Sequence, residues 1–363
     1  MITDATPPRT ARQAQPIAHL PLRWLPLAAG VILLIVVLVG VRFQEPRILA
    51  THRAPVASLA VAPDGQLLAS GAGDFSIGLW ALPDGAPRAT LRGHQDWIFG
   101  LAFSPDGALL ASASWDGTVR LWRVSDGSTQ QVLRHPSLVW DVAFAPDGLM
   151  VATAAEDGAV RLWRVADGTL VQTIPVGGGA VLSVAMAPDG RSVAAGSTDG
   201  TVGIWDTASG VPLQTISAHS ELVFALAYAP DSSALASGAR DGVVRRWRVA
   251  DGALLGALSG HSDRVFAVAF TPEGRQIASG GEDRTVRVWR PDVGSEVRRW
   301  DVGRSRLRAC TPRWAGGIGA SVRTLTDCRF DPGFAPAYAL AFAPDGSFLV
   351  FADDDRVRLS RLP

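Results

Sequence analysis

The sequence of 363 residues lacks two residue types entirely, because it contains neither lysine nor asparagine. This bias indicates a GC-rich, bacterial coding sequence, and the absence of asparagine removes every N-glycosylation acceptor. The 34 basic side chains balance 34 acidic ones, so the formal net charge is zero. A chain without a basic surplus has no long-range field that attracts nucleic acid, and we therefore expect no nucleic-acid partner.

Motifs of catalysis and of cofactor binding are also missing. We find no phosphate-binding glycine loop, no spacing typical of metal ligands and no nucleophile elbow. The sequence therefore predicts a protein that is not an enzyme and that holds no cofactor and no metal. The function has to be inferred from the architecture and from the chemistry of its surface.

The first feature that is present is a long apolar run near the N-terminus, from Trp24 to Val41, between Arg23 and Arg42. Eighteen apolar residues are enough to span a bilayer as a helix. We predict an N-terminal tail over 1–23 and an uncleaved transmembrane helix over 24–42, since no small-residue cleavage site follows the run. Three arginines stand on each side, so the positive-inside rule does not decide the orientation.

The rest of the chain repeats itself. A Pro-Asp-Gly turn, or a close variant of it, recurs in steps of 41 or 42 residues, and its last step is 72. Each unit has room for four short strands separated by turns. The markers of the seven units are Pro63, Pro105, Pro146, Pro188, Pro230, Pro272 and Pro344. Seven such sheets arranged around an axis predict an all-β, seven-bladed β-propeller over 46–363.

Two further patterns favour a closed ring. One strand position holds alanine in all seven units, from Ala60 to Ala341, as we expect where neighbouring blades approach closely near the axis. The chain ends after the third strand of the seventh unit, and 46–51 resembles the outer strands of other units. We therefore expect this N-terminal segment to supply the missing strand and to remove an open edge.

Four polar or aromatic residues recur at fixed spacing in five units. A histidine is followed at steps of 18, 4 and 6 by serine or threonine, aspartate and tryptophan. The sets are His52, Ser70, Asp74 and Trp80; His94, Ser112, Asp116 and Trp122; His135, Thr153, Asp157 and Trp163; His219, Ser237, Asp241 and Trp247; and His261, Ser279, Asp283 and Trp289. In these residues the chain resembles the WD-repeat β-propeller family.

The resemblance implies that each set is a structural tetrad within one blade. The aspartate is expected to accept from the imidazole, and the hydroxyl to link the imidazole to the indole N–H. A catalytic triad is disfavoured, because a nucleophilic site is built once whereas this set occurs five times. Unit four has Gly177 and Ala195 in place of the histidine and the hydroxyl, and unit seven lacks the tryptophan, so we expect these two blades to be the least rigid.

The resemblance also points to a binding face formed by the loops between blades. Partners of such propellers dock on side chains three and five residues after the histidine and on the residue before the turn aspartate. Aromatic residues and arginine at those positions are typical of interface hot spots, although each also has a structural interpretation as packing between blades. The predicted partner-binding residues are Trp97, Phe99, Trp115, Trp140, Phe224, Arg240, Arg264, Phe266 and Tyr338.

An insertion of about 30 residues, at about 301–332, precedes the last unit and contains both cysteines, Cys310 and Cys328. A disulfide between them would staple the loop by roughly 3 kcal/mol and would place the propeller on the extracytoplasmic side of a membrane. Two free thiols on the cytoplasmic side are the alternative.

Together these patterns predict a single-pass, membrane-anchored scaffold that binds a protein or peptide of unknown identity. A propeller enzyme, such as a hydrolase, a lyase or a quinone-dependent oxidoreductase, is the main alternative, with Asp141 and Glu156 as scattered candidate groups. A sensor that binds a small ligand in the axial channel is a third possibility.

Overall fold

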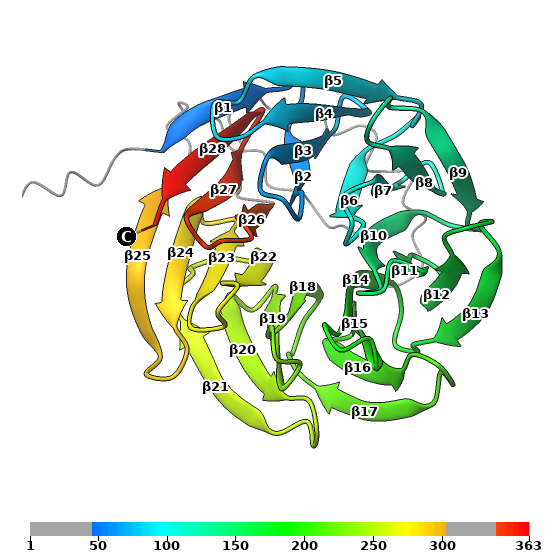
Figure 1. Ribbon diagram of the computed structural model, residues 1–363. Coiled ribbons are helices and arrows are strands. Elements are labelled where there is room, and N and C mark those ends of the chain that lie inside the picture. The colour runs from blue at the N-terminus through cyan, green and yellow to red at the C-terminus, as the bar shows by residue number, and fades with distance from the viewer. Residues whose placement is uncertain (1–45, 303–338, 363) are drawn as a thin grey trace, which may run out of the picture. The chain divides into compact units, whose positions relative to one another are not determined.

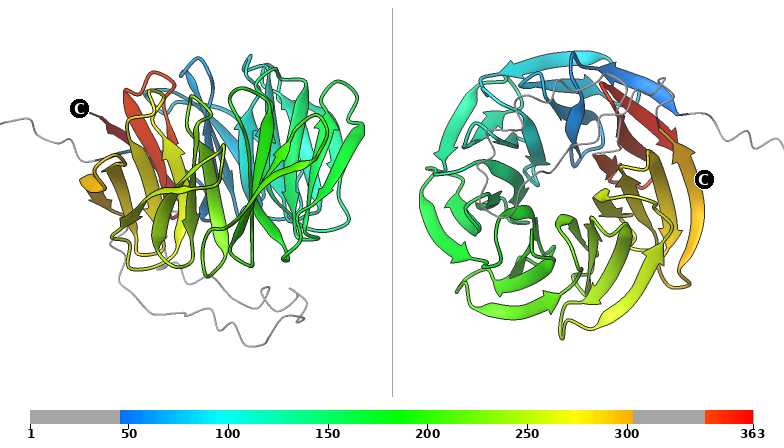
Figure 2. Two further views of the ribbon diagram at one scale, coloured as in Figure 1. Left: turned by 90° about the horizontal axis from the view of Figure 1, so that it is seen from below. Right: turned by 180° about the vertical axis from the view of Figure 1, so that it is seen from behind.

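The computed structural model describes residues 46–302 and 339–362, and every regular element in these ranges is a β-strand. The strands form seven four-stranded antiparallel sheets arranged as blades around a central axis (Figure 1). Strands run between the two faces of the ring, and loops lie on both faces (Figure 2). The predicted seven-bladed all-β propeller is confirmed.

Each blade consists of four strands, given below in order from the axis outward. Blade 1 contains β2 (Val56–Val61), β3 (Leu67–Ala72), β4 (Ser76–Ala81) and β5 (Pro87–Arg92). Blade 2 contains β6 (Ile98–Phe103), β7 (Leu109–Ser114), β8 (Thr118–Arg123) and β9 (Thr129–Arg134). Blade 3 contains β10 (Val139–Phe144), β11 (Met150–Ala155), β12 (Ala159–Arg164) and β13 (Leu170–Pro175). Blade 4 contains β14 (Val181–Met186), β15 (Ser192–Ser197), β16 (Thr201–Asp206) and β17 (Pro212–Ser217).

The remaining blades repeat the arrangement. Blade 5 contains β18 (Val223–Tyr228), β19 (Ala234–Ala239), β20 (Val243–Arg248) and β21 (Leu254–Ser259). Blade 6 contains β22 (Val265–Phe270), β23 (Ile277–Gly281), β24 (Thr285–Arg290) and β25 (Ser295–Asp301). Blade 7 contains β26 (Leu340–Phe342), β27 (Phe348–Asp353) and β28 (Arg356–Arg361), and its outer strand is β1 (Arg47–Thr51).

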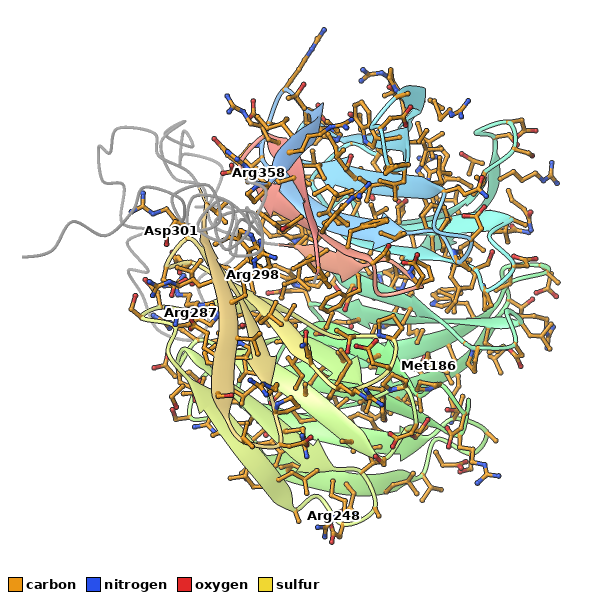
Figure 3. All side chains as sticks on the ribbon, turned by 60° about the vertical axis from the view of Figure 1, so that its left-hand side comes forward. Met186, Arg248, Arg287, Arg298, Asp301 and Arg358 are labelled. Atoms are coloured by element: carbon orange, nitrogen blue, oxygen red, sulfur yellow. The ribbon has the colours of Figure 1, made fainter. Side chains whose placement is uncertain are left out.

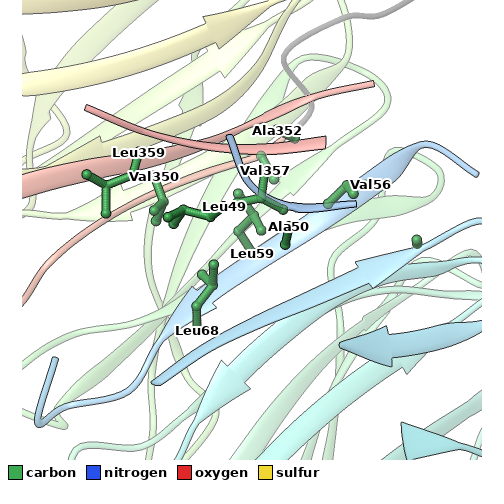
Figure 4. Close-up of a cluster of buried hydrophobic side chains, with 11 residues drawn as sticks. Leu49, Ala50, Val56, Leu59, Leu68, Val350, Ala352, Val357 and Leu359 are labelled. Carbon is green, nitrogen blue, oxygen red and sulfur yellow. The ribbon is translucent and has the colours of Figure 1, made fainter. Parts of the chain in front are cut away.

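The ring closes through β1, which pairs antiparallel with β28 so that Arg47 faces Leu359 and Thr51 faces Arg356. In Figure 1 the blue strand from the start of the chain therefore lies beside the red strand from its end. Leu49 is buried with Leu359 and with Leu59 of blade 1 in one apolar cluster (Figure 4). The prediction that this segment supplies the missing strand is confirmed, and no blade edge is left open at that point.

The turns between the first two strands of each blade follow the residue chemistry of the repeated motif. In blade 2 the Asp106 carboxylate accepts the backbone N–H of Ala108 at 3.0 Å, and Gly107 adopts a φ of +70°. Glycine reaches this left-handed conformation without steric cost, and aspartate commonly bonds the backbone two residues ahead. Blade 5 has Ser232 at the glycine position, and it adopts a φ of +61°.

The core is divided into seven apolar clusters, one between each pair of neighbouring blades. The cluster between blades 2 and 3 shows how the pattern works, because Ala102 of one blade packs in the same cluster as Phe144 of the next. The alanines repeated along the inner strands therefore lie against the neighbouring blade, where a larger side chain fills the space. The expected close contact between neighbouring blades at these alanines is confirmed.

Blades 6 and 7 are also joined on the outside of the ring. The Arg298 guanidinium lies over the ring of Trp300, 4.4 Å from its centroid, and donates to the carbonyl of Arg361 at 3.1 Å. Figure 3 shows Arg298 on this side of the molecule, together with Arg287 of blade 6 and Arg358 of blade 7. This cation–π contact holds Arg298 in position for its hydrogen bond to blade 7.

Several predicted segments lie outside the described residues. They include the tail over 1–23, the transmembrane helix over 24–42, nearly all of the insertion at about 301–332 with Cys310 and Cys328, and the site residue Tyr338. Among residues 46–302 and 339–362, no helix is long and apolar enough to cross a membrane.

Candidate partner-binding face

The side chains near the axis are positioned by a β-bulge in the inner strand of blades 1 to 6. In blade 3 the pairing with β11 shifts between Val139 and Asp141, so Trp140 is the extra residue. A bulge re-aims its side chains and breaks the strict alternation of faces. Trp140 and Asp141 consequently both line the axial cavity. The bulged residues are Ala57, Phe99, Trp140, Leu182, Phe224 and Phe266, all five residues after the histidine position.

Four of the predicted aromatic residues form one continuous group, here called the aromatic cluster: Trp97, Phe99, Trp115 and Trp140. Phe99 stacks on Trp97 and on Trp115, with ring centroids 5.7 Å and 4.5 Å apart. Trp140 of blade 3 meets Trp115 edge to face at 4.9 Å. Each such pair is worth roughly 0.5–1.5 kcal/mol beyond its buried area. All four side chains remain partly exposed, so the cluster presents a rigid aromatic surface.

Backbone and small residues hold the cluster in place. The N–H of Trp115 donates to the carbonyl of Trp97 at 3.0 Å, which ties the turn between β7 and β8 to the loop before β6. The Trp97 ring lies over Gly73 of blade 1, where an added Cβ would come within 2.6 Å of it. The indole N–H of Trp140 donates to Glu156 at 2.6 Å. The cluster thus joins blades 2 and 3 and packs against blade 1 through Gly73.

The other predicted residues gather on the opposite side of the axis. Phe224 and Phe266, from blades 5 and 6, lie with their ring centroids 5.0 Å apart. Arg240 pairs with Glu221, and Arg264 pairs with Glu282, each at 3.1 Å between nitrogen and oxygen. These two arginines are therefore neutralised locally, whereas the aromatic cluster consists of uncharged rings.

Between the two aromatic groups is an axial cavity of about 220 Å³, which is lined by residues from all seven blades. Asp141 is its one titratable lining residue in the described part of the chain. Burial raises the pKa of Asp141 to about 6, although hydrogen bonds from the N–H groups of Val184 and Val142 and from the Ser183 hydroxyl oppose the shift. The cavity lining therefore combines aromatic rings with a carboxylate that is mostly ionised at neutral pH.

The tetrads lie inside the blades. In blade 2 the Trp122 indole N–H donates to Ser112 Oγ at 2.8 Å, and Ser112 Oγ lies 2.6 Å from His94 Nε2. His94 Nδ1 lies 2.8 Å from an Asp116 carboxylate oxygen. Burial would raise the pKa of Asp116, but the hydrogen bonds from His94 and Thr118 hold it well below its usual range. This bonding satisfies buried polar groups and leaves none of them directed at the axial cavity.

Blade 3 departs from the expected pattern. Its His135 bonds to Thr153 at 2.8 Å. The Asp157 carboxylate, however, accepts hydrogen bonds from both terminal nitrogens of Arg161 and none from the imidazole. His135 Nδ1 is left buried without a hydrogen-bond partner among the described residues. Burial and the nearby Arg161 charge lower the pKa of His135 to about 4. The expectation that every tetrad aspartate accepts from its histidine is wrong here, because a guanidinium offers the carboxylate two charge-assisted bonds.

The remaining tetrads follow blade 2 with small variations. In blades 5 and 6 the imidazole Nδ1 lies 3.0 Å from the aspartate. In blade 1, Nδ1 of His52 is 3.4 Å from Asp74, which is an ion-pair distance. In each of these blades the tryptophan N–H donates to the serine hydroxyl.

Asp141 lines the axial cavity but was not predicted as a partner-binding residue. The sequence suggested it only as a candidate group for the enzyme alternative. The repeat itself marks this residue, because the position six residues after the histidine position holds a small residue in the six other units: Ser58, Gly100, Ser183, Ala225, Ala267 and Ala339. A carboxylate in one unit alone stands out against that set. The described residues contain no group of three or more side chains that could hold a metal ion.

The architecture is that of a seven-bladed β-propeller in which five blades carry His–Ser/Thr–Trp hydrogen bonds. The family model "WD domain, G-beta repeat" (WD40) matches six successive segments, and the chain belongs to this family. The matched segments are 43–81, 85–123, 127–164, 168–206, 210–248 and 252–290.

A stretch of 55 residues is 49% identical to a protein of Thermomonospora curvata described as "Probable serine/threonine-protein kinase PkwA". The stretch covers 15% of this chain and 7% of that protein, so the chain spans only a small part of its relative's length.

Proposed function

We propose that this propeller is a scaffold that binds a protein or peptide partner on the face that carries the aromatic cluster. WD-repeat propellers are commonly protein-interaction scaffolds. The observation that supports this particular face is the group of Trp97, Phe99, Trp115 and Trp140, whose rings contact one another and stay partly exposed. Rigid aromatic anchors at the centre of a surface lose little conformational entropy on binding.

A binding role is favoured over an enzymatic one by the contents of the axial cavity. Acid–base or nucleophilic catalysis needs at least two converging reactive groups. The part of the lining that the structure describes holds one titratable side chain, Asp141, and Glu156 accepts the Trp140 indole N–H. We therefore propose that the face recognises a partner and does not catalyse a reaction.

The test is partner capture by the immobilised full chain, followed by mass spectrometry of what is retained. Replacing Trp97, Trp115 and Trp140 with alanine is expected to abolish specific capture while the circular dichroism spectrum is unchanged. A matched control replaces three exposed apolar residues of the outer strands, Leu170, Val171 and Leu213, with alanine. If the tryptophan variant captures the same proteins as the wild type, the proposed face is wrong.

We also propose that the scaffold is anchored in a bacterial membrane through residues 24–42, with the propeller on the extracytoplasmic side. This proposal rests on the apolar run and on the two cysteines, Cys310 and Cys328, in one insertion. Labelling of intact cells with a membrane-impermeant maleimide, before and after reduction, tests it. Labelling that appears only after reduction is expected, whereas labelling that requires cell lysis would place the propeller in the cytoplasm.

A further inference from the structure

The axial cavity combines two features that together favour a positively charged ligand. Its lining includes four aromatic rings, Phe99, Trp140, Phe224 and Phe266, which stand at the bulges of the inner strands. Among the described residues that line it, Asp141 is the one charged side chain, and the others are apolar residues, glycine and serine. Aromatic faces and a carboxylate both attract a cation, and neither attracts an anion.

The contacts of Asp141 leave its charge uncompensated. One carboxylate oxygen accepts the N–H of Val184 at 3.0 Å and the Ser183 hydroxyl at 3.3 Å, and the other accepts the N–H of Val142 at 2.8 Å. All three donors are neutral, and none of the ion pairs among the described residues includes Asp141. These bonds fix the direction of the carboxylate without neutralising it.

Burial makes that charge costly. The pKa of Asp141 is raised to about 6, and the group is still mostly ionised at pH 7. A buried carboxylate without a counter-ion is stabilised when a cation enters its site. Asp354 of blade 7 is a further carboxyl group near this face, and burial and the neighbouring Asp355 and Asp353 raise its pKa to about 6. The carbonyl of Asp354 bonds to Val56, which precedes the cavity residue Ala57.

The size of the cavity limits what enters it. Pockets for drug-sized molecules measure roughly 300–1,000 Å³, whereas this one holds about 220 Å³. That volume accommodates one extended side chain. The surrounding aromatic cluster would then contact the backbone and the flanking residues of the chain that carries it.

We propose that the axial cavity takes a cationic side chain, arginine or lysine, of the partner that docks on the aromatic face, and that its charged group pairs with Asp141. The inference rests on the proposed function, because it assumes a polypeptide partner on this face. It assigns Asp141 as the residue that selects for positive charge, and the rings of Phe99, Trp140, Phe224 and Phe266 as the aromatic lining that contacts the same side chain.

The experiment is isothermal titration of the full chain with three probes: an N-acetylated, C-amidated Gly-Arg-Gly peptide, the same peptide with citrulline in place of arginine, and methylguanidinium. The arginine peptide is expected to bind. The citrulline peptide, which has nearly the same shape and no charge, is expected to bind at least about thirtyfold more weakly, as is usual when one partner of a buried charge pair is lost.

Variants and pH identify the residue responsible. Asp141→Asn is expected to weaken binding of the arginine peptide by about thirtyfold or more. The matched control, Asp147→Asn, removes one negative charge from an exposed turn of the same blade and is expected to leave the affinity unchanged. Binding to the wild type should be about tenfold weaker at pH 5 than at pH 8, because protonation of Asp141 removes its charge.

Each contrary result overturns the proposal. It fails if the arginine peptide does not bind at millimolar concentration, if citrulline binds equally well, or if Asp141→Asn is without effect. Methylguanidinium binding as tightly as the peptide would assign the cavity to a small free cation instead of a partner's side chain. If the tryptophan variant loses partner capture while Asp141→Asn keeps it, the scaffold function stands and this inference is wrong.

Discussion

The hydroxyl of Ser112 lies 2.6 Å from Nε2 of His94, at the centre of the blade 2 tetrad. The same oxygen accepts the indole N–H of Trp122 at 2.8 Å, so one buried atom satisfies two ring nitrogens. Ser112→Ala is expected to lower the free energy of unfolding by about 1–3 kcal/mol, because both partners lose their bond while staying buried.

Chemical denaturation measures this loss. Ser128→Ala is the control, because the Ser128 hydroxyl also makes a side-chain bond, to Asp126, but in an exposed turn. We expect that change to stay within about 0.5 kcal/mol of the wild type. Equal effects of the two substitutions would mean that the tetrad contributes no more than a surface bond does.

Ring closure predicts an asymmetry within β1. Leu49 is 9% exposed and packs in the cluster between blades 7 and 1, whereas the adjacent Ile48 is 44% exposed. Leu49→Ala is expected to cost about 2–4 kcal/mol through lost burial and a cavity, and Ile48→Ala about 0.5 kcal/mol or less. Thermal unfolding of the two variants tests this, and a similar loss for both would contradict the pairing of β1 inside the ring.

The blade 3 tetrad predicts an unusual histidine. The pKa of His135 is lowered to about 4 by burial and by Arg161, so its ring is neutral at pH 7. Because the pKa is lower in the folded chain than in the unfolded chain, the stability it contributes is present above pH 6.5 and is lost as the pH falls toward 4.

Histidine-selective NMR titration measures this pKa directly. Arg161→Gln is expected to raise the pKa of His135, because it removes the positive charge and frees Asp157 to accept from Nδ1. An unchanged titration in that variant would show that Arg161 does not control the imidazole.

Asp141 predicts the opposite dependence on pH. Its pKa is about 6 in the folded chain, above the value of 3.8 for a free side chain, so its contribution to stability is complete below pH 4 and is lost as the pH rises through 6. The asparagine side chain of the Asp141→Asn variant carries no charge at any pH. Relative to the wild type, the variant is therefore expected to gain about 3 kcal/mol between pH 4 and pH 8, which corresponds to a shift of about two pKa units.

Any hydrogen bond that asparagine fails to replace lowers the stability of the variant equally at both pH values. The change between the two pH values therefore reports the titration of Asp141 alone. Denaturant titrations at pH 4 and pH 8 supply the four free energies. A constant difference between variant and wild type would mean that Asp141 titrates as an exposed carboxylate.

How far the sequence predicts the site can be judged from Trp140 and Asp141. The repeat placed Trp140 on the binding face, because five residues after the histidine is a fixed offset in every unit. It did not place Asp141 in the same cavity, because consecutive strand residues normally point to opposite faces. The bulge between Val139 and Asp141 breaks that alternation, and it is visible only in the pairing with β11.

The sequence by itself determined the number of blades, the closing strand and the composition of the tetrads, because each depends on a spacing that the chain repeats. Only the tertiary structure decided which partner Asp157 takes, that the aromatic rings of blades 2 and 3 touch, and that the Asp141 carboxylate lines the axial cavity. Those outcomes depend on distances between side chains of different strands and blades. A periodic pattern sets the fold through local spacing, whereas the hydrogen-bond partner of a carboxylate is decided by the donors that the neighbouring strands bring within reach.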